Sequence, residues 1–433
     1  MDGSNIIQTK RRYAMIKNGA LFVALCIQFF LVFGKPANYD LSWKFYLVFI
    51  GYIFMIFFYL ARGYGKSVYL RYEAGISLIV KNVVINLIMC FFLLTLDEIG
   101  NKAHFPLYML VFTFANLLTI ILINSIGNFI MRRVQQKDKK IIYIFGDEQR
   151  YKREKEKHSI FIRDLSEIDK LEEMIPKYKI IYLVDVPSEL RNPLIKICYS
   201  NRKTVYFTTK LSDILVKTAS ISQDGDTPVY YCNQFGIGRL ASFIKRAFDI
   251  VCSSLALVVL APLMLVIAII IKCEDGGPVF YTQTRCTMNR REFKIYKFRS
   301  MIVESEKKGA QLAVDNDSRI TRIGKFLRNS KLDELPQLIN ILKGEMSIVG
   351  PRPERPEFIE ETIQTVPEFV LRMNVKAGLT GYAQVRAGYS TEFLDKLKWD
   401  LMYIENYSFL LDLKIIVLTV VVILNNNFRK GGV

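Results

Sequence analysis

Two adjacent carboxylates, Asp333 and Glu334, begin an apolar segment in the C-terminal half of a 433-residue chain. Neighbouring residues on a helix point about 100° apart, so these acids suit two different roles rather than one symmetric bridge. Pro336 favours a helix's first turn, which predicts both acids at or near the N-terminus of a helix over 335–342 and favours their ionised form. An ionised Asp can attack phosphorus or ligate Mg²⁺. The alternative is a simple helix cap.

Arginines stand on both sides of this acidic pair. Arg352 lies in a Gly-Pro-Arg-Pro stretch at 350–353 whose prolines stiffen a turn, and Arg328 precedes Asp333 by five residues. A fixed guanidinium is suited to bidentate binding of phosphate. Phosphoryl transfer needs positive charge on the transferring oxygens, a metal and an in-line nucleophile, so the pattern indicates phosphoryl chemistry.

Basic residues are concentrated between 285 and 299, and the core of this stretch, FKIYKFRSM, alternates apolar and basic residues as a strand does. Lys297 and Arg299 share one face of such a strand, and together they could hold a diphosphate and a lipid phosphate. The alternative is a solvated basic face that attracts anionic lipid. The basic residues of the stretch are Arg285, Arg290, Arg291, Lys294, Lys297 and Arg299.

Composition restricts the chemistry further. The chain is 51% hydrophobic, which indicates membrane segments, and its net charge of +18 implies an anionic partner: nucleic acid, anionic lipid or a phosphorylated substrate. It contains only two histidines, and its seven cysteines form no CxxC pair. Histidine-based catalysis, a zinc site and a disulfide framework are therefore disfavoured, which leaves carboxylates and basic residues.

Four apolar runs, over 14–34, 45–61, 76–96 and 107–130, predict four transmembrane helices, because each is near the length of about 20 residues that a spanning helix needs. Basic residues before the first run, between the second and third, and after the fourth place both ends of this unit in the cytoplasm. They include Lys10, Arg11, Arg12 and Lys17, then Arg62, Lys66 and Arg71, then Arg132 and Arg133.

The next hundred residues predict a small α/β domain with a parallel sheet. Strand-like segments at 141–147, 180–187, 204–209 and 228–233 alternate with helix-like segments. Only Gly146 follows the first strand, so the G-x-G-x-x-G fingerprint of a dinucleotide fold is absent. The domain is either a degenerate Rossmann-like nucleotide fold or a spacer, and the spacer is favoured.

A long apolar segment from 250 to 271 precedes the chemistry-bearing residues. Pro262 interrupts it, and basic residues flank it on both sides, which opposes a simple crossing. We expect a re-entrant helix at about 249–272 that returns to the cytoplasmic face; the alternative is a fifth, kinked span. The predicted domains are a transmembrane region (1–137), the α/β domain (138–238) and a C-terminal monotopic catalytic domain (239–433).

Motifs from 245 to 424 closely resemble the bacterial sugar transferases, and more narrowly the large monotopic phosphoglycosyl transferases (polyprenyl glycosylphosphotransferases). They are KRAFD, GPVFYTQTR, YKFRSM, KLDELPQLINILKGEMSIVGPRPERPEF, KAGLTGYAQV and YIENYSFLLDLKI. The helices and α/β region before them are similar to the large members of that family, in a match that rests on architecture.

The resemblance implies an undecaprenyl-phosphate sugar phosphotransferase on the cytoplasmic face of the bacterial inner membrane. It would move a sugar-1-phosphate from a UDP-sugar to undecaprenyl phosphate, release UMP and begin a capsule, exopolysaccharide or related surface glycan. Asp333 would be the nucleophile that carries a covalent phosphosugar, and Glu334 would assist with the metal, Mg²⁺, and with protons. The implied phosphate-binding residues are Lys297, Arg299, Arg328, Arg352 and Arg285. No nucleic-acid partner is expected, and a homo-oligomer stays open.

Three departures from the family pattern stand in this sequence. Thr287 and Arg290 replace glycines after the Gln-Thr-Arg motif, Arg386-Ala387-Gly388 replaces an Asn-Gly-Arg, and Ala261 replaces a serine at the helix break. Two other readings compete with the transferase: a membrane scaffold or nucleotide-sugar sensor with a silent catalytic domain, and a lipid flippase with five spans. The intact Asp-Glu pair and Arg352 favour the transferase.

Overall fold

The computed structural model describes residues 3–33, 43–62, 71–95, 105–136, 141–154, 158–217, 219–232, 236–302, 319–387 and 391–424. The chain forms two compact units, Met1–Thr208 and Thr209–Val433. The loop residue Lys66 and the predicted border at 137/138 lie outside the described residues, and the predicted domain borders stay predictions.

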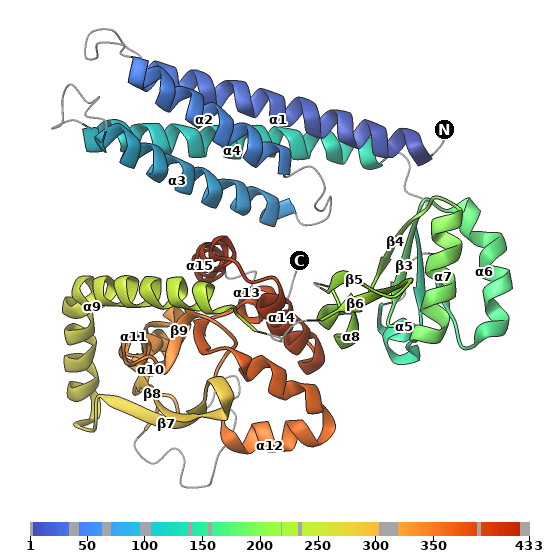
Figure 1. The fold of residues 1–433 in the computed structure, drawn as a ribbon. Coiled ribbons are helices and arrows are strands. Elements are labelled where there is room, and N and C mark those ends of the chain that lie inside the picture. The colour runs from blue at the N-terminus through green and yellow to red at the C-terminus, as the bar shows by residue number, and fades with distance from the viewer. Residues whose placement is uncertain are drawn as a thin grey trace. The chain divides into compact units, whose positions relative to one another are not determined.

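The four N-terminal apolar runs form four helices, as expected (Figure 1). Their bounds are α1 Gly3–Phe33, α2 Trp43–Arg62, α3 Arg71–Thr95 and α4 Phe105–Gln136. Among the residues whose side chains the structure describes, α1, α3 and α4 contain stretches long and apolar enough to cross a membrane, and α2 contains a shorter one, Phe45–Phe57.

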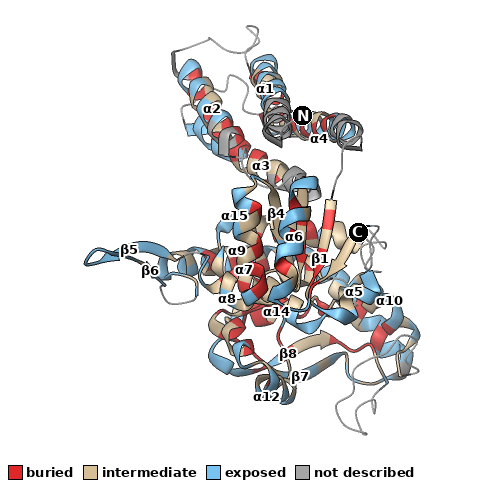
Figure 2. Cartoon of the chain, turned by 90° about the vertical axis from the view of Figure 1, so that its right-hand side faces the viewer, coloured by how far each residue is buried: buried red, intermediate tan, exposed pale blue. Residues whose placement is uncertain are grey.

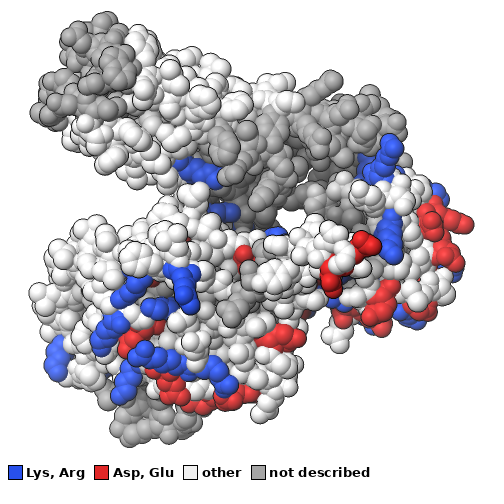
Figure 3. Space-filling view, viewed as in Figure 1, with Lys and Arg blue, Asp and Glu red and all other residues white. Residues whose placement is uncertain are grey.

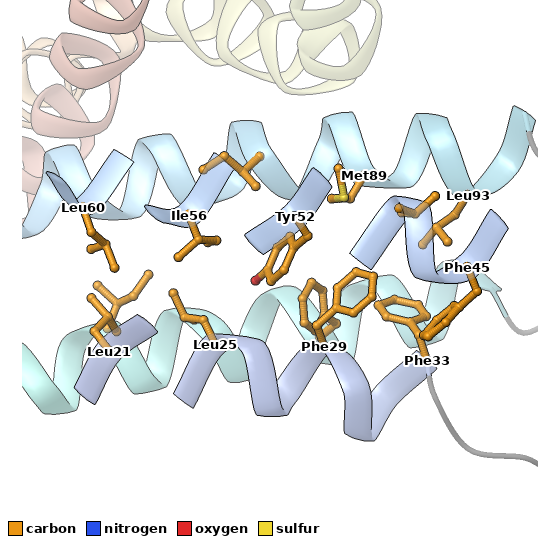
Figure 4. Close-up of a cluster of buried hydrophobic side chains, with 14 of the residues drawn as sticks. Leu21, Leu25, Phe29, Phe33, Phe45, Tyr52, Ile56, Leu60, Met89 and Leu93 are labelled. Atoms are coloured by element: carbon orange, nitrogen blue, oxygen red, sulfur yellow. The ribbon is translucent and has the colours of Figure 1, made fainter. Parts of the chain in front are cut away.

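Aliphatic and aromatic side chains together fill the core between these helices (Figure 4). On α1, every fourth residue from Leu21 to Phe33 is buried, which places one continuous stripe against the other helices. Phe29 stacks on Tyr52 of α2 with ring centroids 4.7 Å apart and meets Phe112 of α4 edge-on at 5.7 Å. These contacts join three helices at one level of the bundle.

A few polar side chains are buried within this apolar core, and large apolar side chains also cover the outer surface of the bundle. The Asn116 amide on α4 donates to the Tyr52 hydroxyl (3.3 Å) and to Asn86 Oδ1 on α3 (3.4 Å). Leu47, Phe54 and many other large apolar side chains are exposed on the outer surface. Buried amides surrounded by an apolar exterior suit helices packed in lipid. Together with the helix lengths, this identifies a membrane protein.

The α/β region contains a four-stranded parallel sheet of order β2-β1-β3-β4. Its strands are β1 Ile141–Phe145, β2 Ser159–Phe161, β3 Ile180–Val184 and β4 Thr204–Phe207. Helices α6 (Ile168–Met174) and α7 (Ser188–Ser200) contribute to the buried core on the sheet, and α5 (Glu148–Glu154) follows β1.

At the carboxyl ends of β1 and β3, the edge where a doubly wound sheet binds ligands, the segments that follow the two strands approach each other closely. A Cβ atom on Gly146 would lie 2.5 Å from the Val186 Cα atom, so the two loops are in backbone contact. Arg150 Nη1 also lies 2.6 Å from Asp185 Oδ2 across this edge. These contacts favour the spacer over a dinucleotide-binding domain.

The strand expected at 228–233 forms but does not join the parallel sheet. It is β6 (Thr227–Tyr231), which pairs antiparallel with β5 (Ser220–Asp224) as a separate hairpin. This part of the parallel-sheet prediction was wrong, because alternation of residue types shows a strand but not its partner. Figure 2 shows both strands largely exposed, and α8 (Leu211–Leu215) precedes them.

The second unit contains one long helix, α9 (Arg239–Asp275), followed by an α/β assembly. At about 1.5 Å per residue its 37 residues exceed the roughly 30 Å of a bilayer core. The helix contains Pro262 and bends sharply (Figure 1), which fits the lost backbone hydrogen bond at an internal proline. Val258, Val259 and many other apolar side chains on α9 are exposed. Whether it crosses the membrane or re-enters it stays a prediction.

After α9, a hairpin of β7 (Phe280–Cys286) and β8 (Glu292–Phe298) and a parallel pair of β9 (Met346–Val349) and β10 (Ala377–Thr380) carry the loops of interest. The other elements are the 3-10 helices η4 (Met288–Arg290), η5 (Leu332–Glu334) and η6 (Pro367–Asn374) and the α-helices α10 (Arg322–Ser330), α11 (Gln337–Lys343), α12 (Pro356–Thr365), α13 (Tyr382–Arg386), α14 (Phe393–Glu405) and α15 (Phe409–Leu424).

Candidate active site

Asp333 and Glu334 lie in a single 3-10 turn, η5, between α10 and α11. Lys331 precedes the turn with a φ of 62°, the left-handed conformation that ends α10 and starts η5. Pro336 caps α11, so the acids stand just before that helix, close to where the sequence predicts them. Both acids are buried, with 7% and 8% of their surface exposed. Burial of two neighbouring carboxylates requires compensation by cations.

Two cations meet on one oxygen of Glu334. Lys297 Nζ on β8 lies 3.0 Å from Glu334 Oε1, and Arg352 Nη2 lies 3.1 Å from the same atom. Burial alone would raise the pKa of Glu334, but Arg352, Lys297 and Lys331 outweigh it and hold that pKa well below its ordinary value. Glu334 is therefore an ionised anchor for two cations, and it is poorly suited to carry a proton near neutral pH.

Asp333 has the opposite environment. Burial and then the negative charge of Glu334 raise the pKa of Asp333, against the attraction of Lys297, Lys331 and Arg328. Among the described residues, Asp333 Oδ1 has no hydrogen-bond partner. Two carboxylates whose pKa values are pushed apart are typical of sites with divided roles. Asp333 has the higher pKa of the two and an oxygen without a described partner, whereas Glu334 is paired with two cations. Asp333 is therefore the better candidate for a nucleophile.

Two other predicted phosphate-binding residues, Arg328 and Arg299, form hydrogen bonds with groups outside the acidic pair. Arg328 on α10 donates from Nε to Ser300 Oγ (2.9 Å) and is near enough to act on Asp333 electrostatically. Arg299 follows β8, is buried, and donates its backbone N–H to Val279 O (2.9 Å). Figure 3 shows Lys and Arg side chains gathered over α10, α11 and β8.

The turn that carries Arg352 is fixed by four successive carbonyl groups. Pro351 O accepts from Gly378 N (2.9 Å) and Glu354 O from Cys286 N (2.9 Å). Between them, Arg352 O accepts from Arg372 Nη2 (3.0 Å) and Pro353 O from Arg285 Nη1 (3.2 Å). With prolines on both sides of Arg352, little backbone freedom remains.

Arg285 therefore contacts the turn rather than the acids in this structure. Its Nη2 atom also donates to Gln283 Oε1 (2.7 Å), and Nη1 lies 3.6 Å from Glu354 Oε2. Its predicted role in phosphate binding stays a prediction, and the geometry gives it a supporting position.

Several supporting residues were not found by sequence reasoning. Asn340 on α11 donates to Lys294 O (2.8 Å) and accepts from Tyr296 N (3.0 Å), which ties the helix after the acids to the strand that carries Lys297. Arg372 and Asp400 support the Arg352 turn. Asn340 could have been identified from the sequence, because it is a polar residue within an otherwise apolar helical segment. The Arg372–Asp400 pairing had no signal, because 28 residues separate its members.

The acids fit a divalent cation that takes few ligands from protein. Mg²⁺ is commonly held by one or two carboxylates together with substrate phosphates. The bare Oδ1 atom of Asp333 suits such a ligand, whereas Oε1 of Glu334 already meets two cations. Among the described residues there is no cluster of three or more metal-ligating side chains.

Asp333 has an oxygen without a hydrogen-bond partner among the described residues, and Lys297, Lys331 and Arg328 act on it electrostatically. Such a site, in a chain with the long apolar helix α9, is suited to bind an anionic ligand in a membrane protein. Residues 240–426 match the family model for bacterial sugar transferases. An exopolysaccharide production protein of Rhizobium leguminosarum is 42% identical over 187 residues, which cover 41% of this chain and 94% of that protein. The chain belongs to the bacterial sugar transferase family, and the family prediction is confirmed.

Longer relatives are matched over about half of their length or less. A UDP-N-acetylgalactosamine-undecaprenyl-phosphate N-acetylgalactosaminephosphotransferase of Aeromonas hydrophila is 41% identical over 217 residues, covering 48% of this chain and 51% of that protein. A UDP-glucose:undecaprenyl-phosphate glucose-1-phosphate transferase of Escherichia coli strain K12 is 42% identical over 198 residues, covering 45% of this chain and 42% of that protein.

Proposed function

We propose that this chain transfers a sugar-1-phosphate from a UDP-sugar to undecaprenyl phosphate and releases UMP. The reaction would take place at the cytoplasmic face of the bacterial inner membrane and begin a capsule, exopolysaccharide or related glycan. The observation that carries the proposal is the unpartnered Asp333 oxygen, within the described residues, beside cations that can bind phosphate. The relatives' names supply the substrate class.

In the first step, an Asp333 carboxylate oxygen attacks the β-phosphorus of the UDP-sugar. The new Asp–O–P bond forms as the bond from that phosphorus to the bridging oxygen breaks, and UMP leaves with the bridging oxygen. In the second step, a phosphate oxygen of undecaprenyl phosphate attacks the same phosphorus and regenerates the carboxylate. Splitting the transfer in this way is covalent catalysis.

The cations have defined tasks in this scheme. Arg352 and Lys297, held by Glu334, would neutralise the donor phosphates as charge moves to the leaving UMP, and Arg328 would assist beside Asp333. When bound, Mg²⁺ would be held mainly by Asp333, with Glu334 nearby, and would offset negative charge on the phosphates. The exposed apolar surface of α9, as a re-entrant helix, would keep the site near the lipid acceptor.

The direct test is release of UMP by membranes that contain the chain, supplied with Mg²⁺, undecaprenyl phosphate and either UDP-N-acetylgalactosamine or UDP-glucose. We expect release by the wild type and loss in Asp333→Asn, which keeps the shape but removes the nucleophile. Equal release by both would overturn the nucleophile assignment. An inert wild type with a full panel of UDP-sugars would support a scaffold or sensor instead.

A further inference from the structure

A buried ion pair that the proposed reaction does not use contacts the backbone of the Arg352 turn. Arg372 on η6 donates from Nε to Asp400 Oδ2 on α14 (3.0 Å), and its Nη2 lies 2.7 Å from the same oxygen. The two residues are 7% and 3% exposed. Loss of either partner would leave an uncompensated buried charge, so the two side chains hold each other in place.

Arg372 connects this pair to Arg352. The Nη2 atom that meets Asp400 also donates to Arg352 O at 3.0 Å. The Arg372 guanidinium lies 4.8 Å from the Phe369 ring centroid, and its Nη1 is 3.9 Å from Glu354 Oε1. Asp400, Phe369 and Glu354 thus fix the plane of the guanidinium that grips the turn.

We propose that Arg372 and Asp400 are positioning residues that hold the Arg352 carbonyl so that the Arg352 guanidinium faces the donor phosphates. Pro351 and Pro353 restrict the backbone on either side of Arg352. The hydrogen bond from Arg372 to the Arg352 carbonyl fixes the orientation of the peptide group between these prolines. The Arg352 side chain then extends to Glu334, where its Nη2 atom lies 3.1 Å from Oε1. Neither residue is described in contact with Asp333 or Glu334, so both act through Arg352.

Lysine cannot replace Arg372 in this arrangement. The planar guanidinium of Arg372 donates to the Asp400 carboxylate and to the Arg352 carbonyl at the same time. A lysine ammonium is a point charge without a fixed plane and cannot reproduce both contacts. Arg372→Lys should therefore keep the charge balance with Asp400 and lose the hold on Arg352. Asp400→Asn should keep the shape of its side chain and loosen the guanidinium.

The inference rests on the proposed function, because it assumes that Arg352 binds the donor diphosphate. The test measures the affinity of the full chain in lipid nanodiscs for UDP by isothermal titration calorimetry, which needs no turnover. We expect Arg352→Gln to weaken UDP binding about 30-fold, and Asp400→Asn and Arg372→Lys about 10-fold, as expected of lost charge-assisted contacts. Asp395→Asn, on the same helix with a 34% exposed side chain paired to Lys398, is the matched control and should bind as the wild type does.

A double-mutant cycle separates positioning from general weakening. Because Asp400 acts through Arg352, the variant with both Arg352→Gln and Asp400→Asn should bind UDP no more weakly than Arg352→Gln alone. Additive losses of UDP affinity in the double variant would overturn the inference. An unchanged UDP affinity in Asp400→Asn and Arg372→Lys would also overturn it, and a lower melting temperature in these variants would then show that the pair contributes to stability alone. If Arg352→Gln itself binds UDP normally, the proposed phosphate-binding role of Arg352 is wrong, which is a different failure.

Discussion

Lys297 Nζ lies 3.0 Å from Glu334 Oε1, and this ion pair joins strand β8 to the turn that carries the proposed nucleophile. Arg352 meets the same oxygen from a third segment. Two cations from other parts of the chain thus converge on one carboxylate, that of the residue next to Asp333. We interpret Glu334 as the electrostatic anchor of the site.

Replacing Glu334 should disrupt the cations rather than a proton transfer. Glu334→Gln leaves Lys297 and Arg352 without their shared anion, so we expect UMP release to fall at least ~100-fold, the cost of misplacing one stabilising group. The pH profile of the residual activity should lose no ionisation, because the low pKa of Glu334 prevents it from titrating near neutrality, and the decline assigned to Asp333 should move to lower pH, because the charge of Glu334 raises the pKa of Asp333. Loss of an ionisation from the profile would show that Glu334 carries a proton and contradict this interpretation.

The pH dependence of the first step should report Asp333. The carboxylate must be ionised to attack, and burial raises its pKa, so UMP release in a single turnover should decline as pH falls through a value above the ordinary ~3.9. Lys331→Gln removes a cation that lowers this pKa and should move the decline to higher pH. Lys325→Gln, at an exposed position of the preceding helix α10, is the control. A move to lower pH in Lys331→Gln would contradict the electrostatic account.

Mg²⁺ should act through Asp333 in a binding experiment. We expect Mg²⁺ to tighten UDP binding by the wild type, because a cation shared between the carboxylate and the phosphates joins protein to ligand. Asp333→Asn should lose most of this tightening while it binds UDP without metal normally. Calorimetric titrations with Mg²⁺ or with a chelator check both statements, and equal tightening in the variant would place the metal elsewhere.

The departure from the family's glycines at Arg290 should have a stability cost. Arg290 has a φ of 60°, in the left-handed region that costs a residue with a side chain about 1 kcal/mol relative to glycine. The exposed ion pair between Arg290 and Glu360 offsets only part of this conformational cost. Arg290→Gly should therefore leave the melting temperature unchanged or raise it. Arg291→Gly, at a φ of −64°, should lower it; equal effects of the two changes would contradict the strain argument.

The course of α9 is open to a labelling test. In a variant that lacks the seven native cysteines, single cysteines at Leu240 and Phe280 flank the helix. A re-entrant helix predicts that a membrane-impermeant maleimide labels both from the cytoplasmic side. Labelling from opposite sides would show a crossing helix and reject the re-entrant prediction.

Sequence reasoning predicted the features that depend on local pattern. Apolar runs of sufficient length gave four helices, and the acidic pair beside Pro336 fell just ahead of α11. The rigid turn at Arg352 follows from its two prolines. The hold of Arg372 on Arg352, across 20 residues of chain, could not be predicted, because spacing carries no information on tertiary contacts. The same limit explains the strand at 227–231, predicted as a strand but assigned to the wrong sheet.

The departures from the family motifs are now partly understood. Thr287 uses its hydroxyl to donate to Glu345 O (2.7 Å) and to accept from Ala377 N (3.1 Å), so it ties the residue after β7 to the start of β10. Arg386 lies 5.5 Å from the ring centroid of Tyr382 and 5.7 Å from that of Trp399.

The central claim is that Asp333 becomes covalently bonded to the transferred phosphosugar. The most direct measurement is the intact mass of the protein after incubation with a UDP-sugar alone, followed by peptide mapping. The account predicts a phosphosugar adduct on Asp333 that is absent in Asp333→Asn and is discharged by undecaprenyl phosphate. Turnover that proceeds at full rate while no adduct ever maps to Asp333 would contradict it.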